Sequence, residues 1–256
     1  MARRSQMATD NVARAFGWAL VATTLGAVEI LVRTEMLNPY IIPPPSDVFR
    51  AVPRLVAEHG ILLRVAQTAY EVVATGLLVC VVGIPIGVVM NAWRSVRDAL
   101  EAWTAALAAA PLVLAFPLFL VIFGRSTSTI IAISFVTGLA PVILKTIEGL
   151  SGTKPVLLSY GASLSMTPRQ ILMKISIPSA IPHIMTGIRL GWTFVLISVV
   201  GVEFLINLGG IGGLVNELAE SYDMPGTYAA ILFAVAISVL FFVILEQAEK
   251  WLPSNR

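Results

Sequence analysis

The chain contains six stretches of mainly apolar residues whose lengths suit a lipid bilayer. An α-helix needs about 20 such residues to cross the hydrocarbon core of a membrane. The sequence therefore predicts six transmembrane helices, at Phe16–Val32, Ala69–Trp93, Ala99–Phe123, Thr129–Ile147, Ile184–Ile206 and Tyr228–Leu245. Pro111 and Pro117 interrupt the third stretch, and prolines are tolerated in membrane helices when neighbours satisfy the freed carbonyls.

The composition agrees with a chain that faces lipid. Hydrophobic residues make up 57% of the chain and charged residues 12%, whereas a soluble domain has about 25% charged residues. The net charge of +2 is too small to indicate a nucleic-acid partner, and the lone Cys80 excludes an internal disulfide. We expect an all-α integral membrane protein with an N-terminal segment (1–15), a single transmembrane domain (16–250) and a tail (251–256).

Lysine and arginine are unevenly distributed over the segments between these helices, and an excess of them marks the cytoplasmic side. If the N-terminus is cytoplasmic, eleven of these residues lie inside and five outside. The inside set is Arg3, Arg4, Arg14, Arg94, Arg97, Lys145, Lys154, Arg169, Lys174, Lys250 and Arg256; the outside set is Arg33, Arg50, Arg54, Arg64 and Arg125. The sequence thus predicts a cytoplasmic N-terminus and a cytoplasmic tail.

The longest loop on the cytoplasmic side, from about residue 148 to 183, predicts two short helices. In the first, "KPVLLSYGASLSM", Pro155 suits an initial turn. Thr167 then precedes Pro168, which is typical of an N-cap followed by proline at the first helical position. The second helix has Ile171, Leu172 and Ile175 as its apolar stripe and is predicted to end before Pro178.

Two roles are open for this helix pair on pattern alone. A short amphipathic helix pair docks into the groove of a partner protein. Alternatively it lies on the lipid headgroups, with Arg169 and Lys174 reaching into water.

The loop resembles the cytoplasmic signature of ABC importer permeases, E-A-A-x3-G-x9-I-x-L-P. Aligned backward from Pro178, the isoleucine position is Ile175, and Ile177 stands for the leucine. The glycine position is Ser165, and the three E-A-A positions are Ser159, Tyr160 and Gly161. The acid and the glycine of the motif are therefore absent from this chain.

Four further segments are similar to the permeases of sulfonate, nitrate and taurine importers. They are IIPPPSDVFRAV at 41–52, GIPIGVVMN at 83–91, PSAIPHIMTGIRLGW at 178–192 and VEFLINLGGIGGLVNEL at 202–218. With the loop, these five motifs extend in order over about residues 40–250, and the chain is identified as a member of this family.

The resemblance implies the type I ABC importer permease architecture, with a coupling-helix loop between the fourth and fifth of six transmembrane helices, in a bacterial cytoplasmic membrane. It implies the translocation pathway of an ATP-driven importer for a small solute, such as a sulfonate, nitrate or carboxylate anion. The implied partners are cytoplasmic ABC ATPase subunits, a second permease subunit (as a homodimer or heterodimer) and an extracytoplasmic solute-binding protein.

The resemblance implies no catalytic residue, metal or cofactor in this chain, with ATP and Mg²⁺ on the ATPase partner. The lack of a G-x-x-x-x-G-K-[ST] loop in the sequence agrees with this expectation. The resemblance assigns ATPase coupling to Ser159, Tyr160, Gly161, Ser165, Thr167, Pro168, Arg169, Ile171, Leu172, Lys174, Ile175 and Pro178.

Four glycines follow the fifth predicted helix: Gly209, Gly210, Gly212 and Gly213. They either break the backbone for a re-entrant segment at the outer gate, as the resemblance implies, or form a flexible loop with close helix contacts. Glu203 matches the family's A-E-x-L acid, and it either lines the pathway or locks one helix to another. Glu29 and Glu71 are expected in contact with water near the outer interface.

The alternative function is that of a gradient-driven secondary transporter or a channel subunit, in which broken helices and buried charges also occur. Against it, the sequence shows no inverted repeat and few acidic residues at mid-membrane depth. His59 and His183 fall on opposite sides of the membrane in this topology, so a shared metal site is not expected.

Overall fold

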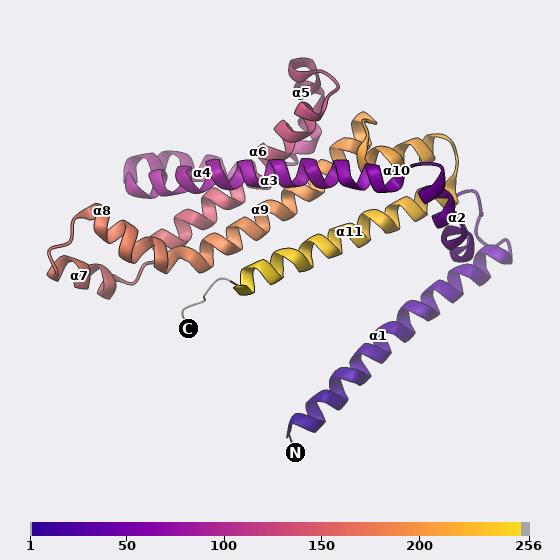
Figure 1. Ribbon diagram of the computed structural model, residues 1–256, viewed down its shortest axis with the longest axis horizontal. Helices are drawn as coiled ribbons and strands as arrows, with labels where there is room; N and C mark the ends of the chain where they lie inside the picture. The colour runs from indigo at the N-terminus through magenta and orange to yellow at the C-terminus, as the bar shows by residue number, and fades with distance from the viewer. Residues whose placement is uncertain (1, 252–256) are drawn as a thin grey trace. The chain divides into compact units, whose positions relative to one another are not determined.

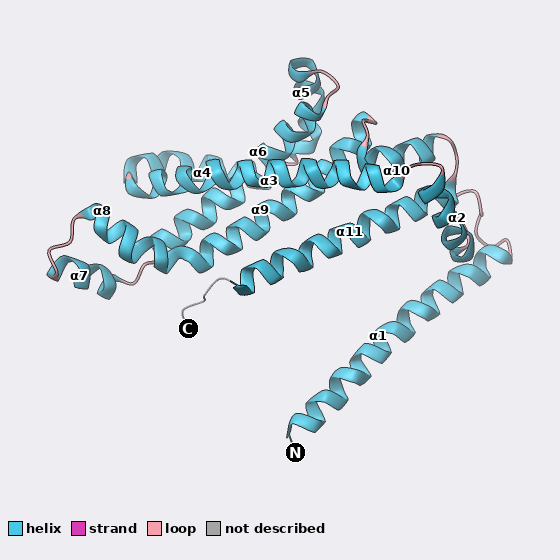
Figure 2. Ribbon diagram, viewed as in Figure 1, coloured by secondary structure: helices cyan, strands magenta, loops and turns pink. Residues whose placement is uncertain are grey.

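The computed structural model describes residues 2–251, with side chains over residues 16–247, and this part of the chain is helical with short connections (Figures 1 and 2). Its elements are α1 (Ala2–Arg33), α2 (Pro45–Ala57), α3 (Ile61–Ala92), α4 (Arg94–Ala109), the 3₁₀ turn η1 (Leu112–Ala115), α5 (Phe116–Phe123), α6 (Thr127–Ser151), α7 (Pro155–Ser163), α8 (Pro168–Ile171), the π turn η2 (Leu172–Ser176), α9 (Ile177–Ile206), α10 (Gly210–Glu220) and α11 (Met224–Trp251). The predicted tail beyond Trp251, and the side chains of the predicted segment 1–15, lie outside the described residues.

Five stretches of the described chain are long and apolar enough to cross a membrane as they stand: Phe16–Arg33, Ile61–Ala92, Thr127–Ser151, Pro168–Glu220 and Met224–Gln247. These contain the first, fourth, fifth and sixth predicted spans, and the second except for its last residue, Trp93. The third is different. The region predicted as one helix, Ala99–Phe123, is a pair of helical segments, Arg94–Ala109 and Leu112–Phe123, bent by 88°.

The break in this pair has a local cause at Pro111. Proline lacks an N–H and pushes the residue before it out of the helical region. Ala110 is accordingly extended, with φ −72° and ψ 135°, and α4 ends there. Pro117 does not break the helix because it occupies the first turn of α5, where a backbone N–H would have no intrahelical acceptor. The third predicted span is therefore a broken pair of helical segments, and of the two prolines that interrupt it in the sequence, Pro111 is at the break.

The chain groups into two compact units, one of residues 62–214 with 234–256 and the other of residues 1–61 with 215–233. In the first, α3, α6 and α9 enclose the largest core. Its buried members are Val72, Val79, Ile130, Ile133, Val142, Val195, Leu196, Val199, Val202 and Ile206. These side chains are buried between helices, whereas the apolar side chains on the outside of the helices are left to contact lipid.

Close approach of α6 and α9 depends on small residues at their crossing. A side chain at Gly191 of α9 would lie 2.9 Å from the backbone oxygen of Gly138 on α6 and 2.6 Å from the side chain of Val142, so the two backbones run close together there. The next residue, Trp192, donates its indole N–H to the sulfur of Cys80 on α3 at 3.2 Å. Its ring also stacks on Phe241 of α11, with centroids 5.6 Å apart. Trp192 thus links three helices.

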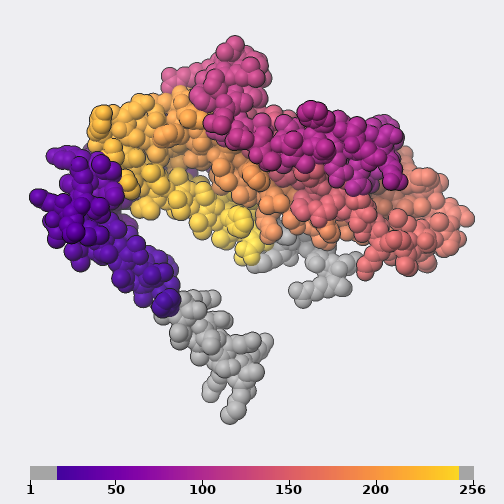
Figure 3. Space-filling model, turned by 180° about the vertical axis from the view of Figure 1, so that it is seen from behind, coloured from indigo at the N-terminus to yellow at the C-terminus, as the bar shows by residue number. Residues whose placement is uncertain are grey.

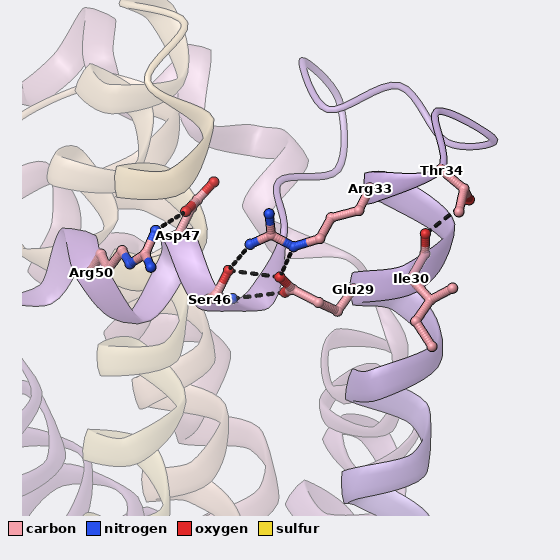
Figure 4. A network of polar contacts seen from close by, with 7 residues as sticks. All are labelled: Glu29, Ile30, Arg33, Thr34, Ser46, Asp47 and Arg50. Carbon is pink, nitrogen blue, oxygen red and sulfur yellow. Dashed lines mark hydrogen bonds and ion pairs between the residues drawn. The ribbon is translucent and has the colours of Figure 1, made fainter.

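In the other unit, Glu29 near the end of α1 holds the start of α2 (Figure 4). Its carboxylate accepts hydrogen bonds from the backbone N–H of Ser46 at 3.0 Å and from the Ser46 hydroxyl at 2.8 Å. Arg33 joins the same network through its 2.6 Å ion pair with Glu29. The Ser46 N–H lies in the first turn of α2, where backbone donors lack helical partners, so Glu29 acts as its cap.

Helix α2 was not among the predicted elements. It buries Val48, Ala51 and Leu55 on one face, and Arg54 on this helix forms an ion pair with Asp223, just before α11. The hydroxyl of Tyr228 also donates to the carbonyl of Ile41 at 3.3 Å. These contacts join the segment around α2 to the start of α11 within this unit.

Candidate functional site

The predicted loop after α6 is an ordered helical hairpin, which we call the coupling hairpin and define as residues 154–176. Its first helix, α7, ends in a Schellman arrangement: the N–H of Met166 donates to the carbonyl of Gly161 at 3.1 Å, and that of Ser165 to Ala162 at 2.9 Å. Ser165 is left-handed, with φ 54°. The signature has glycine at this position, and the geometry shows why, since glycine adopts positive φ without a steric cost.

The second half of the hairpin begins as predicted. Thr167 is the N-cap of α8, and Pro168 lies in its first turn. Thr167 and Gln170 form a capping box: the Gln170 side chain accepts from the Thr167 N–H at 2.8 Å, and the Thr167 hydroxyl accepts from the Gln170 N–H at 3.3 Å.

The helix does not end before Pro178, and that prediction was wrong. Instead, the π turn η2 connects α8 to α9 without a break in the helical path, with the Ile177 N–H bonded to the carbonyl of Leu172. Pro178 then stands in the first turn of α9, where a residue without an N–H is accommodated. A π turn inserts an extra residue into the helix and often marks a functional segment.

The two halves of the hairpin pack against each other through Gly161. A side chain at this position would come within 2.7 Å of Ile175 and 3.2 Å of Ile171, so these isoleucines lie directly on the α7 backbone. The predicted apolar stripe therefore faces α7, while Leu172 packs against the cluster of Leu150, Ala180 and Ile184.

Most of the predicted coupling residues are at the surface. Gly161 is buried and Ile171, Leu172 and Ile175 are partly buried; the exposed ones are Ser159, Tyr160, Ser165, Thr167, Pro168, Arg169, Lys174 and Pro178. The apolar side chains of α7 are also exposed, including Val156 at 77% and Tyr160 at 62%. At nine residues α7 is too short to span a bilayer, which leaves these side chains available to a partner or a surface.

The predicted glycine segment forms a tight corner between α9 and α10. Asn207, Gly209 and Gly210 all have positive φ, at 48°, 61° and 61°. A side chain at Gly212 would lie 2.8 Å from the Cβ of Glu203 and 2.9 Å from the backbone N of Phe204. Gly213 has no atom nearer than 3.5 Å to such a side chain. Gly209, Gly210 and Gly212 are therefore required by the geometry of the corner, and Gly213 is not.

Glu203 lies at the centre of this corner and is fully buried. Its carboxylate accepts from the Gly212 N–H at 2.9 Å and from the Thr68 hydroxyl at 2.7 Å. Thr68 in turn accepts from the Ile211 N–H at 2.9 Å, and Gln67 from the Gly210 N–H at 3.2 Å. Three successive donors at the start of α10 are thus satisfied by side chains, as a helix N-terminus requires. Two roles were considered for Glu203, lining the pathway and locking one helix to another. These contacts correspond to the second, because they hold α10 to α9 and α3.

Glu71 was expected in contact with water, and that prediction was wrong: the residue is 0% exposed. It lies one turn after Gln67 on α3, and the Gln67 amide donates to it at 3.4 Å. The polar spacing of Gln67, Glu71 and Thr75 along one face of an apolar helix was the signal in the sequence that could have revealed this cluster.

The other side of the corner is held by Arg125, which sequence reasoning did not single out. Its Nε donates to the carbonyl of Ile206 at 2.7 Å, and its guanidinium also bonds to the carbonyl of Asn207. These are carbonyls at the C-terminal end of α9, where a cation is favourable. The corner therefore has an acidic side chain at the start of α10 and a cation at the end of α9.

The helical bundle, the bent third pair and the coupling hairpin together define a multi-pass membrane protein with the type I ABC importer permease architecture. A solved structure with the same fold is the inward-facing methionine ABC transporter MetNI, one chain of which superposes with a TM-score of 0.65 at 16% identity, covering 74% of this chain and 94% of that one. Residues 81–253 match the family of binding-protein-dependent transport system inner membrane components, and the chain belongs to that family.

Curated relatives agree with this membership. The taurine transport system permease protein of Escherichia coli (strain K12) is 22% identical over 221 residues, covering 84% of this chain and 80% of that protein. The nitrate import permease protein of Synechococcus elongatus is 23% identical over 240 residues, covering 91% and 83%. The chain is thus a permease subunit of the ABC importer class and a multi-pass protein of the inner membrane.

Proposed function

We propose that this permease forms the translocation pathway of an ATP-driven importer, with its N-terminus and coupling hairpin in the cytoplasm. ATP and Mg²⁺ bind a partner ATPase subunit, and closure of two such subunits draws two docked hairpins together. The helices above then change from an inward-facing to an outward-facing arrangement. A second permease subunit completes the pathway, and an extracytoplasmic solute-binding protein delivers the substrate.

The observation that carries this proposal is the coupling hairpin. It is packed internally through Gly161 and capped by Thr167 and Gln170, yet it leaves Val156 and Tyr160 exposed. It connects through the helical path of η2 directly to α9. A force applied to the hairpin is therefore transmitted along α9 to the corner at Glu203. There the hydrogen-bonded start of α10 serves as the outer gate in this proposal.

We propose a small anion as the substrate, of the sulfonate, nitrate or carboxylate kind. The names of the taurine and nitrate permeases support this choice. Uptake of labelled taurine and nitrate, each competed by unlabelled anions and by choline, a cation without an anionic group, tests it. Competition by the anions supports the assignment, and competition by choline alone contradicts it.

The function is tested by co-expressing the chain with the ATPase encoded beside its gene and reconstituting the pair in liposomes. ATP-dependent uptake, and ATP hydrolysis stimulated by the solute-binding protein, are the expected results. Tyr160→Asp should abolish co-purification of the ATPase. The matched control Tyr222→Asp changes a tyrosine that is 86% exposed but lies outside the hairpin, and it should leave the complex intact. Uptake driven by an ion gradient without the ATPase would establish the secondary-transporter alternative instead.

A further inference from the structure

The charged residues of the coupling hairpin are all cations: Lys154, Arg169 and Lys174. The nearest acids along the chain are Glu148 before it and Glu203 after it. Glu148 pairs with Lys145 at 2.5 Å, and Glu203 is buried in the corner. Within the side chains that the structure describes, the three cations are exposed and form no ion pair. No side chain between residues 16 and 247 therefore compensates their charge through an ion pair.

Two of these cations stand where they do not help their own helices. Lys154 is the N-cap residue of α7, and Arg169 lies in the first turn of α8. Positive charge at a helix N-terminus opposes the helix dipole. Stability of the hairpin therefore does not explain their positions, whereas an external group of opposite charge does.

The exposure of α7 indicates that the hairpin binds in a protein cleft and not on a flat membrane surface. Residues 154–160 are all exposed, among them the apolar Val156, Leu157, Leu158 and Tyr160 in consecutive or nearly consecutive positions. They therefore point in several directions around the helix axis. A lipid surface covers one face of a helix, but a protein cleft encloses more of it. The space-filling view shows the region of the coupling hairpin, in salmon, at one edge (Figure 3).

We infer that the coupling hairpin inserts into a cleft of the ATPase subunit whose walls carry carboxylates opposite Lys154, Arg169 and Lys174. This inference rests on the proposed function and adds the charge of the partner. The motif's acidic position is the exposed, neutral Ser159, so this hairpin presents no carboxylate to a basic cleft. Charge complementarity sets partner choice and association rate, and the hairpin thus selects an acidic ATPase over ATPases with basic clefts.

The test measures the dissociation constant between the full-length permease in nanodiscs and its neighbouring ATPase subunit. Lys154→Glu, Arg169→Glu and Lys174→Glu are combined in one variant, and Arg94→Glu is the control because Arg94 is an exposed cation of the same proposed side outside the hairpin. We expect the triple variant to raise the constant by about tenfold or more at low salt, and the control by less than about twofold. Wild-type affinity should fall as salt rises, and this dependence should disappear in the triple variant.

Replacing the carboxylates of the ATPase cleft with lysine should restore binding to the triple variant. A misfolded hairpin would not regain binding in this way, so the rescue separates a charge effect from misfolding. Equal affinity of wild type and triple variant would overturn the inference while the proposed function stands. A charge effect seen in nanodiscs of anionic lipid but absent in zwitterionic lipid would also overturn it, by assigning the cations to the membrane. Failure of the wild type itself to bind the ATPase would remove the proposed function as well.

Discussion

The two adjacent glycines at the start of α10 provide a stringent test of the corner geometry, because the same substitution should have opposite effects at each. Gly212→Ala places a methyl group 2.8 Å from the Cβ of Glu203 and 2.9 Å from the backbone N of Phe204, and also against the carbonyl of Val200. Backbone atoms in a packed helix cannot move away as a flexible side chain does. Gly213→Ala meets nothing closer than 3.5 Å, an ordinary van der Waals contact.

The expected magnitudes follow from these contacts. Overpacking costs about 1–3 kcal/mol, and displacement of Gly212 also strains its hydrogen bond to Glu203, a further cost of about 1 kcal/mol. Alanine at position 213 instead gains up to about 1 kcal/mol in helix propensity. The two variants should thus differ by roughly 2–5 kcal/mol in the free energy of unfolding. At about 2–4 °C per kcal/mol for a chain of this size, their melting temperatures should differ by roughly 4–20 °C.

Thermal unfolding of the purified permease in detergent, followed by fluorescence-detected size exclusion, measures this difference. Gly212→Ala should melt below wild type, and Gly213→Ala at or slightly above it. ATP-driven uptake should fall with the first substitution and persist with the second. Equal melting temperatures, or a larger loss for Gly213→Ala, would refute the packing at the corner.

Three further substitutions are predicted from single contacts. Ser165→Gly should stabilise the chain by about 1 kcal/mol in thermal unfolding, because it relieves the left-handed conformation of a residue with a side chain. Thr68→Val should destabilise it by about 1–3 kcal/mol, since the Ile211 N–H and the Glu203 carboxylate each lose a partner, while Thr68→Ser should remain near wild type. Arg125→Gln should free the last carbonyls of α9, and hydrogen exchange followed by mass spectrometry should become faster over residues 207–212.

Each of these has a result that contradicts it. A lower melting temperature for Ser165→Gly would mean that Ser165 makes a stabilising contact beyond its backbone. Equal losses for the valine and serine variants at Thr68 would attribute the effect to packing instead of the hydroxyl. Unchanged exchange in Arg125→Gln would show that the corner is held by Glu203 and Thr68 alone.

Residues that act through local chemistry were predictable from the sequence. Thr167 followed by Pro168 predicts an N-cap from two neighbouring residues, and the structure confirms it. The glycine run predicts a break after α9 because positive φ favours glycine. The run did not reveal which glycines the corner requires, since Gly212 and Gly213 differ only in what approaches them from α9.

Sequence analysis missed the residues whose hydrogen-bond partners lie far away in the chain, because a local pattern does not show which distant residue approaches them. Thr68 and Glu203 are 135 positions apart, and Arg125 and Ile206 are 81 apart. Nothing local to Thr68 or Arg125 distinguishes it from an ordinary polar residue near a membrane interface. The prolines show the same limit: Pro111 breaks its helix, whereas Pro178 is accommodated, and the difference lies in the π turn η2 before Pro178.

The bend of 88° between α4 and α5 has a consequence for the biogenesis of this protein. α4 has 16 residues and α5 only 8, so at about 1.5 Å per residue neither reaches across a hydrocarbon layer of roughly 30 Å on its own. Only when the pair counts as one span does the number of candidate spans reach six. In the proposed topology, the direction of α6, α9 and α11 then depends on this pair, and so does the side of the coupling hairpin, which is synthesised later.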